Sequence, residues 1–250
     1  MSPIVKAMQR IAVEPQQILD RTIYLNAAQE HYLKRVLRSK VGDRFVAMDG
    51  RGQWWEAQLV MDEDGSLLGE IDRQLDVLTE LPVSVTLFAA LPKGSGFDEV
   101  VRQTTELGVS RIVPVFSQRT LLNPSSNKLK RWRRIATEAA EQSERQIVPE
   151  LSEPLSFREA VAAIGDVPAY FCVARGTVPH FHAALQTALR EVSLRDLSIF
   201  VGPEGGWTTD EVRQAKDTGC QLVSLGRRVL RAVTAPVFAL SVVAAVWETQ

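Results

Sequence analysis

The sequence predicts an α/β protein with two domains, a small β-rich N-terminal domain and a larger domain built on a parallel sheet. Up to about residue 75, short segments rich in β-branched and aromatic residues are separated by turn signals. Beyond residues 76–82 the strands alternate with helices, and these strands are near-continuous apolar runs. Such runs are typical of a parallel sheet covered on both faces. We therefore expect domains at residues 1–76 and 77–250.

The N-terminal domain is expected to form a small barrel with one packed helix. Pairs such as Asp49-Gly50 mark the turns between its strands. The four expected strands are residues 21–25, 44–48, 53–60 and 67–71. The helix is expected at residues 27–38, because Asn26 is a suitable N-cap and Gln29 completes a capping box. Its apolar face consists of Tyr32, Leu33, Val36 and Leu37.

The C-terminal domain is expected to alternate strands with helices. The expected strands are residues 83–90, 111–116, 169–174, 197–202 and 221–225. The expected helices are residues 97–107, 128–143, 157–164, 181–191, 209–218 and 235–247. Ligands of such sheets bind beyond the carboxyl ends of the strands. The loops that follow the strands are therefore where we expect a functional site.

Composition predicts a cytoplasmic protein with a local cationic surface and no metal. The net charge is −1, yet residues 81–150 hold ten Lys and Arg against seven Asp and Glu. No apolar run approaches the roughly 20 residues that span a bilayer, and the first residues lack the apolar stretch of a signal peptide. Cys172 and Cys220 are expected to be buried thiols. The three histidines form no cluster with metal-ligand spacing.

A turn with three glycines follows the fourth strand of the C-terminal domain. A helix is expected to start after it, at Thr208 or Thr209. Glycine lets the backbone approach a ligand closely, and a helix start offers unpaired N–H donors. The spacing is neither that of a P-loop nor that of a dinucleotide-binding motif. By itself the turn fits a ligand site and a structural helix entry equally well. Its residues are Gly202, Pro203, Glu204, Gly205 and Gly206.

A second glycine-bearing loop, residues 225–231, favours the ligand site. It also follows an apolar strand, and it precedes a helix that we expect Thr234 to cap. Two such loops at adjacent strand ends would form a crevice walled by backbone amides and carbonyls, which suits a purine ring and ribose better than a triphosphate. Arg227, Arg228 and Arg231 add a cationic rim that suits an anionic substrate.

These two loops and three further segments resemble, in order, the signature of the SPOUT-class ribosomal RNA small subunit methyltransferase E family. The resemblance spans nearly the whole chain, and five motifs in order are specific. Val233 departs from it, since the family usually has Glu there, and the identity of a general base stays open. The further segments are His31-Tyr32-Leu33 with Val36-Leu37-Arg38, Leu91-Pro92-Lys93-Gly94 with Glu106-Leu107-Gly108-Val109, and Lys128-Leu129 with Arg131-Trp132 and Glu138-Ala139-Ala140-Glu141-Gln142-Ser143.

The resemblance implies a PUA-like N-terminal barrel and a C-terminal domain with a deep trefoil knot, although threaded connections are very rare. It implies S-adenosylmethionine as cofactor, a homodimer, and methylation of N3 of one uridine in 16S rRNA, within the small subunit or an assembly intermediate. The alternatives are a methyltransferase of another RNA and an RNA-binding protein that keeps the fold without turnover. A nucleotide-binding enzyme of unrelated chemistry is disfavoured by the missing phosphate-loop spacings.

The cofactor site and the catalytic residues are expected in the two loops and at the end of one further strand. Glu204 is a candidate general base, the alternative being a carboxylate that caps its own turn. Arg228 is a candidate for stabilising the uracil anion, the alternative being a salt bridge with a local carboxylate. The expected cofactor-binding residues are Val173, Ala174, Val201, Gly202, Pro203, Glu204, Gly205, Gly206, Ser224, Leu225, Gly226, Arg228, Val229 and Leu230.

Cations on several elements are expected to hold the RNA backbone. A run of them lies on the polar side of the helix at residues 128–143, the alternative being a solvated face paired with Glu138 and Glu141. The expected RNA-binding residues are Lys34, Arg35, Arg38, Lys93, Arg119, Lys130, Arg131, Arg134 and Arg231.

The last helix, at residues 235–247, is apolar almost all round. Its large side chains, including Phe238, Val242 and Trp247, cannot all face one core. We expect a dimer interface beside the cofactor loop, and the alternative is a central helix of a monomer.

Overall fold

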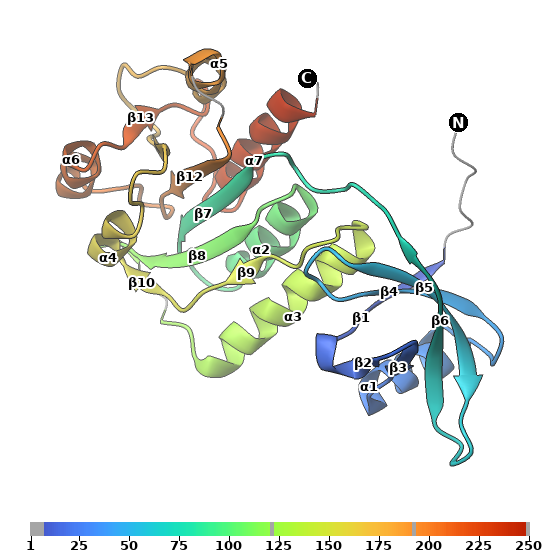
Figure 1. Ribbon diagram of the computed structural model, residues 1–250. Helices are drawn as coiled ribbons and strands as arrows, with labels where there is room; N and C mark the ends of the chain where they lie inside the picture. The colour runs from blue at the N-terminus through green and yellow to red at the C-terminus, as the bar shows by residue number, and fades with distance from the viewer. Residues whose placement is uncertain (1–7, 121–122, 192–193, 249–250) are drawn as a thin grey trace. The chain divides into compact units, whose positions relative to one another are not determined.

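The computed structural model describes residues 8–120, 123–191 and 194–248. The chain forms two compact units, and Figure 1 shows their elements. Unit 1 comprises Met1–Glu80 and Ala140–Val148, and unit 2 comprises Leu81–Ala139 and Pro149–Gln250.

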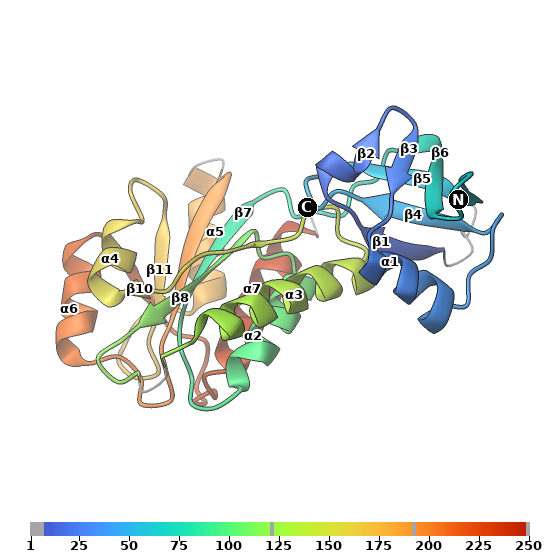
Figure 2. The same ribbon diagram turned by 90° about the horizontal axis from the view of Figure 1, so that it is seen from below.

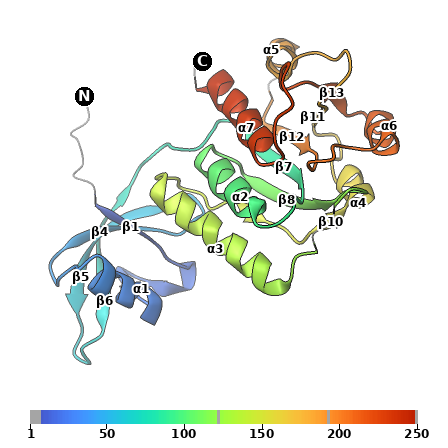
Figure 3. The same ribbon diagram turned by 180° about the vertical axis from the view of Figure 1, so that it is seen from behind.

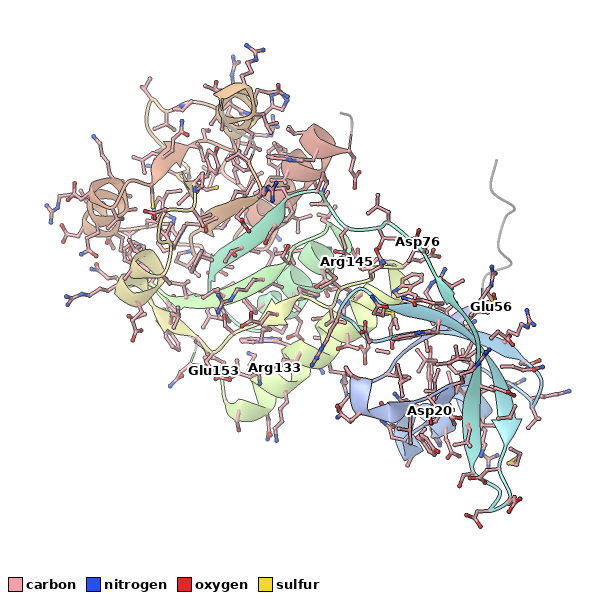
Figure 4. The ribbon with its side chains drawn as sticks, in the orientation of Figure 1. Asp20, Glu56, Asp76, Arg133, Arg145 and Glu153 are labelled. Atoms are coloured by element: carbon pink, nitrogen blue, oxygen red, sulfur yellow. The ribbon has the colours of Figure 1, made fainter. Side chains whose placement is uncertain are left out.

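Residues 140–148 group with unit 1, whereas the predicted division at residues 76 and 77 places them in the second domain. The reason is their packing: Ala140 is buried in an apolar cluster with Val46 and Trp54. The guanidinium of Arg145, labelled in Figure 4, forms an ion pair with the carboxylate of Glu80, and both side chains are largely buried. A segment distant in sequence thus completes the N-terminal unit.

Unit 1 contains a six-stranded sheet that curves around one apolar core. The order is β1-β4-β5-β6-β3-β2, with β1 parallel to β4 and the other pairs antiparallel. Ile11 of one edge strand and Ile23, next to the other edge, share the core. The four predicted strands are confirmed, and β1 and β2 are additional. The strands are β1 (Gln9–Ala12), β2 (Ile18–Leu19), β3 (Thr22–Tyr24), β4 (Arg44–Met48), β5 (Trp54–Met61) and β6 (Leu67–Leu75).

The helix of unit 1 begins as predicted and then changes type. α1 (Ala27–His31) has Asn26 as its N-cap, and Gln29 completes the capping box. The next five residues form a π-helical turn, with the N–H of Leu37 bonded to the carbonyl of Tyr32. The prediction that Val36 packs on the barrel is wrong, because it is 59% exposed. The wider π turn shifts the residues after it around the axis, away from the face that a 3.6-residue period predicts.

Unit 2 is built on a seven-stranded sheet in which every pair is parallel. The order is β10-β8-β7-β12-β11-β13, and β9 also pairs with β8. The five predicted strands are confirmed, and β9 and β10 are additional two-residue strands. The strands are β7 (Ser84–Ala90), β8 (Arg111–Phe116), β9 (Glu150–Leu151), β10 (Leu155–Ser156), β11 (Ala169–Cys172), β12 (Asp196–Val201) and β13 (Gln221–Val223).

Helices cover both faces of this sheet (Figures 2 and 3). Successive residues of β11 point to opposite faces. Phe171 packs in a cluster with Phe157 of α4 and Ala215 of α6. Tyr170 instead contacts Phe181 of α5, with ring centroids 5.2 Å apart. The helices are α2 (Gly96–Glu106), α3 (Ser126–Gln142), α4 (Phe157–Ala162), α5 (Phe181–Glu191), α6 (Thr209–Asp217) and α7 (Thr234–Trp247).

In unit 2, the predicted start of α6 is confirmed, whereas the predicted N-cap of α7 is not. The predicted helix start at Thr208 or Thr209 is confirmed, because α6 begins at Thr209 with Thr208 as its N-cap, in a capping box with Glu211. The prediction that Thr234 caps α7 is wrong, because Thr234 is already helical and Val233 occupies the N-cap position without a side-chain bond. No helix in the described ranges is long and apolar enough to cross a membrane. The strand order does not show whether the chain threads through a loop, so the knot stays a prediction.

Candidate functional site

A cavity of about 600 Å³ lies at the carboxyl ends of three strands of unit 2. Its walls are the loops that follow β11, β12 and β13. The prediction that the two glycine loops follow adjacent strands is wrong, because β11 lies between β12 and β13. The loop after β11 therefore supplies a third wall. The location is the one expected for a ligand of a parallel α/β sheet.

The cavity is lined by every predicted cofactor residue except Ser224. The Ser224 hydroxyl instead donates to the carbonyl of Gly226 at 3.0 Å and accepts the Gly226 N–H at 3.1 Å. Gly226 has φ +118°, a conformation that side chains rarely adopt. Ser224 and Gly226 together fix the shape of this loop. The role of the lining residues in binding stays a prediction.

Glu204 joins two loops of unit 2. Its Oε1 accepts the backbone N–H of Lys93 at 3.1 Å, 111 positions earlier in the chain. Lys93 follows β7, the neighbour of β12 in the sheet. The carboxylate is thus a hydrogen-bond acceptor for another loop, whereas the sequence suggests a cap on its own turn. This bond favours a structural role for Glu204 over that of a base.

Aromatic rings pack beneath the glycine turn. The indole of Trp207 contacts the rings of Phe157 and Phe171, with centroids 5.3 and 4.8 Å apart, respectively. A Cβ at Gly202 would lie 3.1 Å from the indole ring, so glycine allows the turn to lie against it. Trp207 also lines the cavity. Trp207 was not among the predicted site residues, but its position directly after the five-residue turn could have indicated it.

The cavity contains few groups that could act as a base. Cys172 lines it, but burial raises the pKa of this thiol to about 12, so it is protonated at neutral pH. Cys220 is likewise a buried free thiol, as predicted. Glu204 is the only carboxylate on the cavity wall among the described residues. Within the described ranges no cluster of His, Cys, Asp and Glu could hold a metal ion.

Three arginines, Arg119, Arg175 and Arg228, lie at the cavity. Arg119, predicted to bind RNA, donates instead to the carbonyl of Gly205. Arg175 was not predicted, although it directly follows the predicted residues Val173 and Ala174 in the loop after β11. Among the described residues, neither Arg228 nor Arg231 pairs with a carboxylate. The predicted alternative of a local salt bridge is therefore absent there, and these guanidinium groups are available to an anion.

The other predicted RNA contacts are exposed and lie outside the cavity. Lys34 and Arg35 are in the π-helical turn of unit 1, and Arg38 lies two residues after that turn, with φ +55°. Lys93 is on the loop after β7 of unit 2, and Arg231 is exposed in the loop before α7.

The predicted cationic face of α3 is partly ion-paired. Arg131 pairs with Asp98 at 2.9 Å, and Arg134 pairs with Glu138 at 3.3 Å. Figure 4 shows Arg133 next to Glu153, and their side chains pair at 2.6 Å. Lys130 has no ion pair among the described residues. At Arg134 the helix therefore fits the alternative prediction, a solvated face with ion pairs. At Lys130 it keeps an unpaired charge that could contact RNA.

Comparison with known proteins places the site in a family. A model for the RNA methyltransferase domain matches residues 79–244, and a model for the RNA methyltransferase PUA domain matches residues 25–72. The chain is 46% identical to ribosomal RNA small subunit methyltransferase E of Synechocystis sp. over 96% of its length and 78% of the relative. It is 32% identical to the Bacillus subtilis protein of that name, covering 94% of this chain and 96% of the relative.

A solved structure agrees with these matches. The fold is similar to that of ribosomal RNA small subunit methyltransferase E from Neisseria gonorrhoeae bound to S-adenosyl methionine, with a TM-score of 0.85 and 30% identity. The similarity covers 96% of this chain and 98% of the other. The chain therefore belongs to the ribosomal RNA small subunit methyltransferase E family, with an N-terminal PUA domain and a C-terminal RNA methyltransferase domain.

Proposed function

We propose that the cavity binds S-adenosylmethionine and that the chain methylates N3 of one uridine in 16S rRNA. The observation that carries this proposal is the cavity formed by three loops at the carboxyl ends of β11, β12 and β13 in a member of this family. Its size suits a nucleoside-sized ligand. The apolar side chains of Val201, Leu225 and Leu230 and the glycine backbone of both loops fit a purine ring and a ribose. The related Neisseria structure is bound to S-adenosyl methionine.

The residues of the site would contribute mainly by positioning. When bound, the cofactor supplies an electrophilic methyl group for an in-line displacement. The uridine N3 must lose its proton to attack, and donors that stabilise the resulting anion assist this step. Arg228, exposed at the cavity and without a carboxylate partner among the described residues, fits that role. The cavity walls align donor and acceptor and exclude water. The uridine must be unpaired, because N3 lies on its Watson–Crick edge.

The test of the proposed function is mass mapping of modified uridines in 16S rRNA from cells with and without the protein. The expected result is one uridine that lacks its N3-methyl group when the protein is absent. An unchanged 16S rRNA map together with a missing methyl group in another RNA would favour the alternative substrate. Cofactor binding without any missing modification would favour an RNA-binding protein without turnover. We also propose that the protein acts in the cytoplasm, on the small subunit or an assembly intermediate.

Replacing Glu204 with glutamine is expected to leave methylation largely intact. Glutamine keeps an oxygen that can accept the Lys93 N–H, so the hydrogen bond between the two loops survives. A general base, in contrast, would be removed completely. Single-turnover methylation at neutral pH measures the difference. A fall of about a hundredfold or more, in the range typical of removing a general base, would instead make Glu204 that base.

Reversing the charges of Lys130 and Arg134 together is expected to weaken RNA binding but not cofactor binding. Both residues are exposed on α3, and this pair leaves the Arg131–Asp98 ion pair intact. The slope of log affinity against log salt should fall by about one unit for each phosphate that the protein no longer neutralises. The matched control reverses Arg213 and Lys216 of α6, which changes the net charge equally. Equal effects of the two pairs would reject a specific role for α3.

We propose that α7 forms a homodimer interface. Leu240, Val243 and Trp247 are buried within the protomer, but Phe238 and Val242 are only partly covered. Sedimentation at micromolar concentration is expected to show a species of twice 27.8 kDa. Phe238→Glu should dissociate it, because a charge is costly in an apolar interface. A wild-type protein that sediments at 27.8 kDa would support a monomer.

A further inference from the structure

A buried carboxylate outside the cavity joins the cavity wall to a separate loop. Glu211, in the first turn of α6, is only 1% exposed. Its Oε2 accepts the backbone N–H of Thr208 at 2.7 Å and the Thr208 hydroxyl at 3.1 Å, which completes the capping box. Its Oε1 accepts the backbone N–H of Gln118 at 2.8 Å. Gln118 lies 93 positions earlier, after β8, so one carboxylate serves two segments of unit 2.

The loop that Glu211 holds carries Arg119 to the cavity wall. The hydroxyls of Ser117 and Thr120 lie 2.9 Å apart, and the Thr120 oxygen also accepts the Ser117 N–H at 3.0 Å. These bonds make a tight turn with a defined backbone. The guanidinium of Arg119 then donates to the carbonyl of Gly205. A Cβ at Gly205 would lie 3.0 Å from the Arg119 side chain, so the arginine packs directly on the glycine turn.

We propose that Glu211 is a positioning residue for the cofactor, acting through Gln118 and Arg119 on the glycine turn at residues 202–206. This inference rests on the proposed function, since it takes the cavity to be the S-adenosylmethionine site. A glycine-rich turn has many accessible conformations, and selecting one of them on binding costs affinity. The path from Glu211 to Gly205 selects the conformation before the cofactor arrives. The buried carboxylate thereby sets cofactor affinity without touching the cofactor.

The test is the Glu211→Gln variant. In glutamine one of the two oxygens becomes an NH₂ group, so the Thr208 N–H, bonded to Oε2, and the Gln118 N–H, bonded to Oε1, cannot both keep their acceptors. One partly buried N–H loses its partner, and we expect the dissociation constant for S-adenosylmethionine, measured by calorimetry, to rise about tenfold. Amide hydrogen exchange at residues 202–207 of the free protein should become faster. Methylation at saturating cofactor should stay near the wild-type rate, because the turn still forms around a bound ligand.

The matched control is Glu159→Gln. Glu159 makes the same capping box with Ser156 at the start of α4, but its two hydrogen bonds stay within that box and it does not line the cavity. Its substitution should leave cofactor affinity and exchange at residues 202–207 unchanged. Equal affinity losses in the two variants would mean that a weakened cap, and not the bond to Gln118, is responsible.

Arg119→Met breaks the path at its exposed end, where misfolding is not a concern. It should raise the dissociation constant like Glu211→Gln, and Arg119→Lys should restore part of the affinity because an ammonium can still donate to Gly205. The double variant that combines Glu211→Gln with Arg119→Met should bind no worse than either single one, since both changes break one connected path. Multiplying effects, or wild-type affinity in Arg119→Met, would overturn the inference. If the wild type itself did not bind S-adenosylmethionine, the proposed function would fail, while the exchange rates would still test the path.

Discussion

The Gly226→Val variant is expected to bind S-adenosylmethionine about five- to a hundredfold more weakly than the wild type, measured by calorimetry. Gly226 has φ +118°, and both its N–H and its carbonyl bond to the Ser224 hydroxyl. A β-branched residue in this conformation costs about 1–3 kcal/mol, and each 1.4 kcal/mol is a factor of ten in affinity. The loop relieves the strain by changing shape, which moves the cavity wall at Leu225 and Arg228.

Gly219→Val provides the control for this prediction. Gly219 also has positive φ, +90°, and a Cβ at either glycine would meet no atom within 4 Å. Gly219 does not line the cavity. Both variants should therefore lose stability in urea unfolding, but only Gly226→Val should lose cofactor affinity. Wild-type affinity in Gly226→Val would show that the observed loop conformation is not needed for binding.

The parts of the fold that the sequence predicts depend on local rules. The apolar runs of the sheet, the capping box at Asn26 and the helix start at Thr209 each depend on residues within a few positions of one another. The predictions are wrong where the residue pattern allows more than one local structure, or where an element is too short to show a pattern. A π turn exposes Val36 although its spacing fits an α-helical face. The two-residue strands β9 and β10 are too short to show a period.

In the candidate site, too, the sequence predicts the features that depend on neighbouring residues and misses those that depend on distant ones. The sequence places the two glycine loops at strand ends, because a strand followed by glycines is a local pattern. It does not show that β11 separates their strands, since strand order depends on pairing between distant segments. The bonds from Glu204 to Lys93 and from Glu211 to Gln118 span 111 and 93 positions. No pattern within one segment encodes such partners, so the functions of both carboxylates follow only from the fold.

The Trp132→Ala variant is expected to lose about 3–5 kcal/mol of unfolding free energy, measured by urea denaturation followed by circular dichroism. Trp132 of α3 is fully buried, and its ring lies 4.4 Å from that of Phe97, centroid to centroid. Its indole N–H donates to Asp98 at 2.8 Å. Truncation removes the ring packing between α3 and α2 and leaves a large void. Since whole domains are stable by about 5–15 kcal/mol, this loss is a large fraction of the total.

Trp132→Phe separates packing from hydrogen bonding at the same position. Phenylalanine keeps an aromatic ring against Phe97 but cannot donate to Asp98, which still pairs with Arg131 at 2.9 Å. We expect a cost of about 1.5–3 kcal/mol, the range for removing one hydrogen bond to a charged group. A Trp132→Phe cost equal to that of alanine would assign the stability to the hydrogen bond. A Trp132→Ala cost below about 1 kcal/mol would contradict the packing argument, because a buried ring removed without collapse must leave a cavity. Since α3 also presents Lys130 and Arg134, RNA affinity should survive in the phenylalanine variant and fall in the alanine variant with the fraction folded.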